Sequence, residues 1–472
     1  MSKSYNRMQW RVLIATMIGY TLFYFMRKNF SFAMPGLEQD CGITKSQLGN
    51  FLFAGGIVYG VSKFVNGFVG DRVNSRKMLC LGLLACTLVN VAFGFVPDFA
   101  SGQVMVWAFG LLLVLNQFFQ GTGFPPCARL IAFWVPPNEL ATKMSVWNTS
   151  HSIGGGLVAK ICGVIMGLGV LGAANQGVGM WKWCFWTMAI LGAVGLVAMW
   201  LWLPGTPEEE GMEGNNRIDE LTNNRIDELT NNRNGGNNRI DESSSDRMKG
   251  EKTDAARNRT IEQSEKLNNS SARPSALKNV FCSPAIWMLG LCNFSINAVR
   301  SLVADWGPTM LQEAKGFTAS ESGTVIMFFE FAGIVGMLVS GWATDRLFGG
   351  HAPRLCTFLM ALTAALFAAF LLVPSPTLAS AALVAAGFTL YGPQALTGVT
   401  ATNLASKSLT GTAIGFISLF SYIGVSVSGK VCGNLAESCG GWATPVWVMA
   451  AVAALGTVFF VTIWNAKAEY QK

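Results

Sequence analysis

Long apolar segments that alternate with short polar connections dominate this chain. The sequence contains twelve of them, and only 13% of its 472 residues are charged. A helix needs ~20 apolar residues to cross a bilayer, and each segment reaches that length. Because backbone groups in lipid must be satisfied within the segment, we expect an all-α membrane protein with twelve transmembrane helices. The expected spans are 10–37, 46–69, 78–97, 103–134, 143–171, 182–204, 283–311, 319–343, 355–374, 377–402, 411–435 and 442–464.

Cations near the segment ends are distributed unevenly, which predicts the orientation. Sixteen lysines and arginines lie near segment ends. Thirteen of them lie on the side of the membrane predicted to hold the N-terminus, and three lie on the opposite side. Connections rich in lysine and arginine remain on the cytoplasmic side of a membrane. We therefore expect a multi-pass protein of the cytoplasmic (inner) membrane with both termini in the cytoplasm. The first apolar segment is too long for the core of a cleavable signal peptide, so none is predicted.

A very polar stretch separates the first six segments from the last six. It contains the octapeptide Asn-Asn-Arg-Ile-Asp-Glu-Leu-Thr at Asn215–Thr222, again at Asn223–Thr230, and in part at Asn237–Glu242. A stretch of this composition buries too little apolar surface to offset the entropy cost of ordering. We predict an N-terminal six-helix half over 1–204, a flexible cytoplasmic linker over 205–278 and a C-terminal six-helix half over 279–472.

Three features of the first half recur in the second at nearly one spacing. The repeated pairs are Gly67–Arg72 with Gly341–Arg346, Ile153–Lys160 with Ile423–Lys430, and Arg27 with Arg300, at offsets of 274, 270 and 273 residues. Parallel repeats of this kind are related by an axis along the membrane normal. We therefore expect two pseudo-symmetric six-helix halves.

Six cations lie inside apolar segments, where each needs a partner. They are Arg27, Lys28, Lys63, Lys160, Arg300 and Lys430. An unpaired arginine at membrane depth costs at least ~2.5–3.5 kcal/mol on insertion scales. The first segment stays apolar beyond Arg27 and Lys28, so both cannot be flanking anchors. Either acidic side chains or an anionic cargo must compensate these charges.

A Gly-x-x-x-Asp-Arg motif follows both the second and the eighth segment. Its charged residues are Asp71 and Arg72 in the first copy and Asp345 and Arg346 in the second. Each carboxylate could pair with a neighbouring segment and hold one face of the protein closed. The alternative reading is that these charges only set the topology. The motif in both positions resembles that of the major facilitator superfamily, which implies its fold.

Seven further motifs, in order along both halves, resemble the organophosphate:phosphate antiporters of that superfamily. This family includes bacterial glycerol-3-phosphate and hexose-phosphate transporters and a hexose-phosphate sensor. The step Gly392-Pro393-Gln394 and the deep Lys430 look more like the hexose-phosphate branch. The motifs are Tyr24–Pro35, Tyr59–Phe64, Phe119–Arg129, Trp147–Gly156, Arg300–Trp306, Phe329–Gly333 and Tyr391–Gln394.

The resemblance implies that Arg27 and Arg300 face each other across a central cavity and hold a phosphoryl group. A guanidinium group remains charged and binds phosphate through two parallel hydrogen bonds, which agrees with this role. Pairing of Arg300 with Asp305 is the alternative, although a spacing of five is poor for a helical pair.

The matched motifs imply further site residues. For substrate binding these are Lys63, His151, Tyr20, Tyr24, Tyr59, Tyr391, Tyr422, Asn148, Gln120 and Lys430. The resemblance also pairs Lys28 with Asp305 and Glu330, in a structural and switching role. Other readings remain for some of these residues. His151 could be a satisfied core residue, a tyrosine could be a membrane-interface anchor, and Lys160 and Lys430 could extend to the outer interface.

The predicted function is exchange of an organophosphate, with glucose 6-phosphate as first choice, for inorganic phosphate by alternating access. No ATP-binding motif, metal-ligand cluster or covalent nucleophile occurs in a suitable context, so we expect no enzymatic activity, cofactor, metal or nucleic-acid partner. The 11 cysteines are scattered. One alternative is a hexose-phosphate membrane sensor that signals to a membrane kinase. Another is a facilitator for a different organic anion.

Overall fold

The computed structural model describes residues 3–70, 72–171, 179–207, 209–211, 282–404 and 410–465. The described residues up to Glu210 and from Pro284 onward form one compact unit. Asp71 and nearly all of the predicted linker, including its repeats, lie outside the described residues. The three predicted region boundaries therefore stay predictions.

The described part of the chain contains thirteen α-helices and is confirmed as all-α. The first half holds α1 (Lys3–Cys41), α2 (Lys45–Gly70), α3 (Ser75–Phe99), α4 (Gly102–Gln120), α5 (Phe124–Trp134), α6 (Pro137–Leu171) and α7 (Met180–Trp202). The second half holds α11 (Pro284–Lys315), α12 (Ala319–Arg346), α13 (Ala352–Leu372), α14 (Pro376–Leu404), α15 (Thr410–Ser438) and α16 (Ala443–Thr462).

One predicted span is broken into two helices. Helix α4 ends at Gln120 and α5 begins at Phe124, with Gly121, Thr122 and Gly123 between them. Proline has no backbone N–H and is best tolerated at the first positions of a helix, and α5 carries Pro125 and Pro126 there. The two helices together form one span, Gly102–Trp134. The thirteen described helices therefore make twelve membrane crossings, as the sequence predicts.

Ten of the described spans are long and apolar enough to cross a membrane by length and composition alone. Helices α1 and α14 are not among them. Helix α1 carries Arg27 and Lys28 near its middle. The membrane-depth charges that mark the functional site thus also weaken the apolar signal of the helix that carries them.

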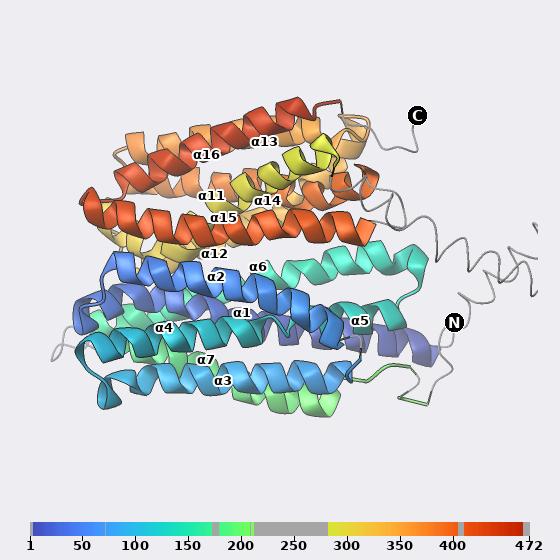
Figure 1. Cartoon of the computed structure of the whole chain (residues 1–472), viewed down its shortest axis with the longest axis horizontal. Helices are drawn as coiled ribbons and strands as arrows, with labels where there is room; N and C mark the ends of the chain where they lie inside the picture. Colours follow the sequence, from blue (N-terminus) through green and yellow to red (C-terminus); the bar gives the residue numbers. More distant parts are fainter. Residues whose placement is uncertain are drawn as a thin grey trace, which may run out of the picture. The chain divides into compact units, whose positions relative to one another are not determined.

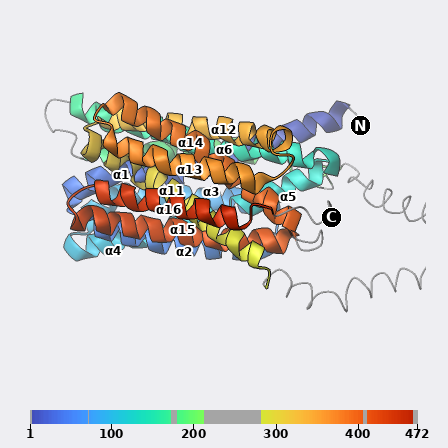
Figure 2. The same cartoon turned by 90° about the horizontal axis from the view of Figure 1, so that it is seen from above.

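The two halves lie on opposite sides of the bundle (Figure 1). Helices α1–α7 (blue to green) gather on one side and α11–α16 (yellow to red) on the other, and in the view from above the second half lies in front of the first (Figure 2). Helix α1 begins and α16 ends at the same end of the bundle, which we call the terminal end. Across the halves, α6 packs against α12 and α2 against α15.

Glycine lets the two halves approach closely at the end opposite the termini. A Cβ atom on Gly163 of α6 would lie 2.8 Å from the carbonyl oxygen of Ala319 on α12, and one on Gly49 of α2 would lie 3.1 Å from that of Gly429 on α15. Small residues allow such backbone contact between membrane helices. Nearer the terminal end, a Cβ atom on Gly415 would meet nothing within 4 Å. The halves are therefore closely packed at the end opposite the termini.

Candidate functional site

A cavity of about 260 Å³ lies between the two halves. Small-molecule sites typically span roughly 300–1,000 Å³, so this cavity suits one small metabolite. Its polar and aromatic lining from the first half is Tyr20, Tyr24, Arg27, Tyr59, Lys63, Phe124, Asn148 and His151. Its polar lining from the second half is Asn293, Asn297, Arg300, Gln394, Thr397, Ser418, Ser421 and Tyr422. The structure thus brings Arg27 and Arg300 into one cavity.

Arg27 is surrounded by aromatic rings rather than by carboxylates. Its guanidinium carbon lies 4.0 Å from the ring centroid of Tyr59 and 5.6 Å from that of Tyr24. The negative face of an aromatic ring attracts a cation without neutralising it. The guanidinium therefore keeps its charge available to an anion in the cavity.

Buried amides hold the helix that carries Arg27. Asn90 of α3 and Asn116 of α4 each donate a hydrogen bond to the carbonyl oxygen of Met26, at 3.3 and 2.7 Å. Gln120 of α4 donates to the carbonyl oxygen of Phe23 at 2.9 Å. Such interhelical bonds join membrane helices where no hydrophobic force acts between them. The backbone of the turn that precedes Arg27 is thereby fixed to α3 and α4.

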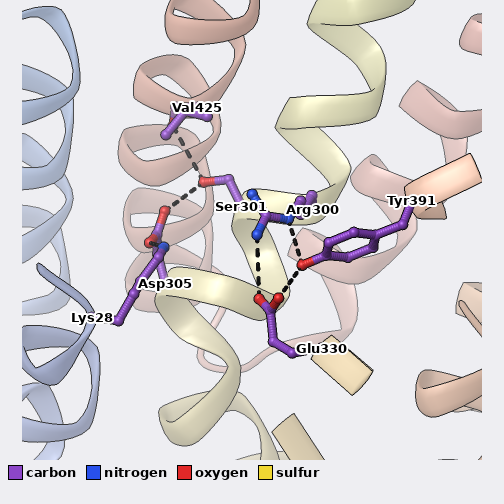
Figure 3. A network of polar contacts seen from close by, with 7 residues as sticks. All are labelled: Lys28, Arg300, Ser301, Asp305, Glu330, Tyr391 and Val425. Atoms are coloured by element: carbon purple, nitrogen blue, oxygen red, sulfur yellow. Dashed lines mark hydrogen bonds and ion pairs between the residues drawn. The ribbon is translucent and has the colours of Figure 1, made fainter. Parts of the chain in front are cut away.

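Arg300 forms a compact polar group with Tyr391 and Glu330 (Figure 3). Its Nε donates to the Tyr391 hydroxyl at 2.8 Å, and its Nη2 lies 3.3 Å from Glu330 Oε1. The Tyr391 hydroxyl donates in turn to the other carboxylate oxygen of Glu330. Glu330 is 3% exposed. The charge of Arg300 is therefore balanced, in contrast to that of Arg27.

Lys28 and Asp305 form an ion pair between the halves, also drawn in Figure 3. Lys28 Nζ lies 2.5 Å from Asp305 Oδ1, and Ser301 donates to Asp305 Oδ2 at 2.7 Å. This pair joins α1 to α11. The family resemblance pairs Lys28 with both Asp305 and Glu330, whereas in this structure Glu330 contacts Arg300 instead. Asp305 pairs with Lys28 and not with Arg300.

Lys63 and His151 complete the lining of the first half. Lys63 Nζ donates to the Tyr422 hydroxyl at 2.8 Å and lies 4.2 Å from the centroid of the Phe124 ring. His151 Nδ1 contacts the carbonyl oxygen of Asn148, while its Nε2 is buried without a hydrogen-bond partner. Lys63 thus also connects the halves, through α2 and α15.

The lining is strongly cationic. It contains Arg27, Lys63 and Arg300, and no carboxylate belongs to its described residues. Within the part of the chain that the structure describes, neither Arg27 nor Lys63 has a carboxylate at ion-pair distance. A cleft lined by one sign of charge concentrates ions of the other sign. The site is therefore built for a small anion.

Comparison with known proteins identifies the family. Residues 16–429 match the model of the Major Facilitator Superfamily. The chain belongs to this superfamily. It is therefore a multi-pass integral membrane protein of a transport family and not an enzyme, as the sequence predicts.

Three relatives of this major facilitator protein match over almost the whole chain. The glycerol-3-phosphate transporter of Bacillus subtilis is 32% identical, covering 98% of this chain and 94% of that protein. The membrane sensor protein UhpC of Salmonella typhimurium is 31% identical, with 97% and 92% covered. A probable hexose phosphate transport protein of Chlamydia pneumoniae is 31% identical, with 98% and 93% covered. They confirm the resemblance drawn from the sequence motifs.

Solved structures of other major facilitator proteins share the fold. A crystal structure of a D-xylose-proton symporter superposes with a TM-score of 0.68 and covers 98% of each chain. The sequence identity is only 14%. This likeness concerns the fold alone, and the chemistry of the cavity must be argued from the residues of this chain.

Three candidate residues do not line the cavity of this major facilitator protein. Gln120 anchors α1, and Tyr391 lies behind Arg300. Lys430 Nζ lies 5.4 Å from the centroid of the Phe53 ring. Lys160, at the equivalent position of the first half, donates to Thr324 of α12 at 2.8 Å. Direct substrate contact by any of them stays a prediction.

The Asp-Arg motifs lie away from the cavity. Arg72, Asp345 and Arg346 are exposed, and none forms an ion pair with another described residue. Asp71 is outside the described residues. The first motif loop is instead held by Arg129, which donates to the carbonyl oxygen of Val73 at 2.9 Å. The clamp role of these motifs stays a prediction.

Sequence reasoning missed the uncharged polar residues of the second half. Asn293 and Asn297 stand two turns and one turn before Arg300 on α11, and Gln394 and Thr397 are three apart on α14. Residues at these spacings share a helix face. Polar residues on one face of an otherwise apolar helix were the signal that could have found them.

Proposed function

We propose that this protein exchanges an organophosphate for inorganic phosphate by alternating access, with glucose 6-phosphate as the expected organophosphate. A bacterial inner membrane with both termini in the cytoplasm is the proposed location. Relatives named as glycerol-3-phosphate and hexose phosphate transport proteins support an organophosphate as the cargo. The exchange partner and the sugar are inferred from the family resemblance and the cavity.

One observation carries the proposal: Arg27 and Arg300 line the same cavity from different halves. A phosphate group accepts hydrogen bonds at several oxygens, so a single anion can bind both guanidinium groups. Bridging of this kind draws the halves together around the cargo. Rocking of one half against the other around a central site is how transporters with this repeat architecture alternate access.

The partners of the two arginines give them different roles. Arg300 is positioned by Tyr391 and Glu330, so it presents its remaining donors in a fixed direction. Arg27 rests against the aromatic faces of Tyr59 and Tyr24 and is the uncompensated charge. Phosphate therefore compensates Arg27 and Lys63 when it binds. An empty cavity keeps these cations unneutralised, which disfavours return without cargo.

A sensor is the second candidate. It is favoured by the 31% identity to a membrane sensor protein over 97% of this chain. A sensor would use the same cavity to bind hexose phosphate, would exchange little, and would act through a membrane kinase. Binding alone thus cannot separate the two functions, whereas exchange can.

Exchange in proteoliposomes preloaded with labelled phosphate tests the proposal. Glucose 6-phosphate, glycerol 3-phosphate or no substrate is added outside, with Arg27→Lys and Arg300→Lys as controls. We expect efflux that requires external organophosphate, ranks glucose 6-phosphate first and vanishes in both variants. Binding without exchange would establish the sensor. Uptake of another organic anion that both variants retain would refute the phosphate site.

A further inference from the structure

Helices α14 and α15 form one wall of the cavity. Two hydroxyl groups on this wall already donate their hydrogens to backbone carbonyl oxygens. Thr397 Oγ1 donates to the carbonyl oxygen of Gln394 at 2.9 Å, and Ser418 Oγ donates to that of Ile414 at 2.7 Å. A hydroxyl has a single hydrogen to donate. Thr397 and Ser418 therefore offer only lone pairs to a molecule in the cavity.

Gln394 adds a third acceptor to this wall. It lines the cavity, and its Oε1 is buried without a hydrogen-bond partner in the described part of the chain. Leaving a buried polar atom unpaired costs most of its desolvation energy, so such atoms in native proteins usually have a partner. Here the partner must be a donor, and the cavity is where a donor can enter.

His151, on the first half, presents a fourth acceptor. Its Nδ1 contacts the carbonyl oxygen of Asn148, which can only accept, so Nδ1 carries the hydrogen. In the neutral ring Nε2 is an acceptor. This atom is buried and has no partner among the described residues.

The cavity therefore holds charged donors together with acceptors that lack a donor. Arg27, Lys63 and Arg300 supply charged donors, whereas Gln394, Thr397, Ser418 and His151 supply acceptors. A phosphate dianion only accepts, so it matches the cations and leaves the four acceptors unpaired. Hydroxyl groups can donate to those acceptors, whereas an ionised carboxylate cannot.

We propose that Gln394, Thr397, Ser418 and His151 form a specificity site that accepts hydrogen bonds from hydroxyl groups of the non-phosphate part of the substrate. This rests on the proposed function, since it requires the phosphate group to occupy the arginine side. The substrate is then a polyhydroxylated phosphate ester, such as a sugar phosphate. Phosphate esters that end in a carboxylate are excluded, because an ionised carboxylate cannot donate a hydrogen bond to these four acceptors.

Fluorinated substrates test the direction of these hydrogen bonds. Fluorine in place of a hydroxyl keeps the size of the group but removes its donor. Binding of glucose 6-phosphate, its three analogues fluorinated at carbon 2, 3 or 4, 3-phosphoglycerate and inorganic phosphate is measured on the purified full chain. We expect at least two fluorinated analogues to bind roughly threefold to tenfold more weakly than glucose 6-phosphate, the usual effect of one lost neutral hydrogen bond. Competition by 3-phosphoglycerate should be weaker still.

The substitution Gln394→Met removes the acceptor and nearly keeps the shape of the side chain. We expect it to weaken glucose 6-phosphate binding by a similar factor, to leave inorganic phosphate binding unchanged, and to cancel the penalty at one fluorinated position. Gln103→Met is the matched control, since Gln103 is exposed near the beginning of α4. This control should behave like the parent protein in every assay.

Each outcome separates the two proposals. If inorganic phosphate binds but all fluorinated analogues bind as well as glucose 6-phosphate, the acceptor site is wrong and the proposed function stands. The acceptor site is also wrong, and the proposed function again stands, if Gln394→Met changes phosphate binding and glucose 6-phosphate binding equally. If neither phosphate nor any ester binds, both proposals fall.

Discussion

Each charged side chain near the centre of the molecule has a different kind of environment. Lys28 is paired with a carboxylate, Arg300 with a carboxylate and a phenol, and Arg27 with the aromatic rings of Tyr24 and Tyr59. The type of residue at each position could be read from the sequence, because cations inside apolar segments are rare. Which cation takes which carboxylate depends on side-chain directions between helices far apart in the chain. The family resemblance supplied the pair of Lys28 with Asp305, but it did not supply the pair of Arg300 with Glu330.

The pair between Lys28 and Asp305 should behave as a unit. Removing one member of a buried ion pair leaves an uncompensated charge and costs about 3–5 kcal/mol. We expect Asp305→Asn to lower the thermal unfolding midpoint in detergent markedly, and the double variant Lys28→Gln with Asp305→Asn to recover much of the loss. Additive losses in the double variant would show that the two side chains do not stabilise each other.

The hydroxyl of Tyr391 should matter for phosphate affinity although it does not line the cavity. In Tyr391→Phe the ring remains, but the bonds to Arg300 and Glu330 are lost. Hydrogen bonds to charged groups contribute about 1.5–3 kcal/mol, so phosphate affinity should fall roughly tenfold or more. Binding of labelled phosphate measures it. Tyr5→Phe, at the start of α1, serves as control, and an unchanged affinity in Tyr391→Phe would contradict a positioning role.

At the scale of whole helices, the end opposite the termini is tied by charges as well as by glycine contacts. Lys45, at the start of α2, lies 2.5 Å from Glu38 of α1 and 3.1 Å from Glu313 of α11. Glu437, near the end of α15, accepts from the backbone N–H of Ser46 at 2.6 Å. The contacts of Lys45 with Glu313 and of Ser46 with Glu437 join the two halves, so they must break when this end opens.

We expect Lys45→Gln to make opening at this end easier. The carboxylates are 31% and 42% exposed, and exposed ion pairs contribute about 0.2–1 kcal/mol each. Only the pair with Glu313 joins the two halves, so the population open at this end should rise by a factor of up to about five. Fluorescence transfer between dyes on the two halves can measure the shift. Lys182→Gln, whose pair with Asp98 lies within the first half, is the matched control.

The helices themselves were largely predictable from the sequence. Every expected span corresponds to one described helix or, at 103–134, to α4 and α5 together. The break between α4 and α5 is local. Two glycines and two prolines interrupt the helix there, but the whole stretch is long and apolar enough to be predicted as one segment. The bonds from Asn90 and Asn116 to Met26 were not predictable, because an apolar pattern shows where a helix lies and not which neighbour its polar side chains meet.

For the whole molecule, two exposed native cysteines allow a direct test of orientation. Cys282 precedes α11 on the terminal side, and Cys439 follows α15 on the opposite side; both are exposed. With the termini in the cytoplasm, a membrane-impermeant maleimide should label Cys439 in intact cells and Cys282 only in inverted vesicles. The variants Cys282→Ser and Cys439→Ser assign each signal. The reverse pattern would overturn the predicted topology.

The unequal balancing of the cavity cations has an electrical consequence. Because Glu330 neutralises Arg300 while Arg27 and Lys63 lack carboxylates, the empty carrier holds two unbalanced positive charges. If the cargo is a divalent phosphate ester, as proposed, it cancels both charges, and the loaded carrier then crosses the membrane field as a neutral object. Each unbalanced charge that moves through the full field is worth about 2.3 kcal/mol per 100 mV.

A voltage across the membrane should therefore slow the reorientation of the empty cavity from one side of the membrane to the other in one direction. It should leave the rate of exchange between two divalent anions unaffected. Proteoliposomes with a potassium diffusion potential can compare exchange with net phosphate release, and a voltage-dependent exchange would count against this charge balance. With the termini inside, a negative interior holds the empty cavity facing inward. The protein would then wait for cargo on the side where phosphate is abundant, held there by the membrane potential itself.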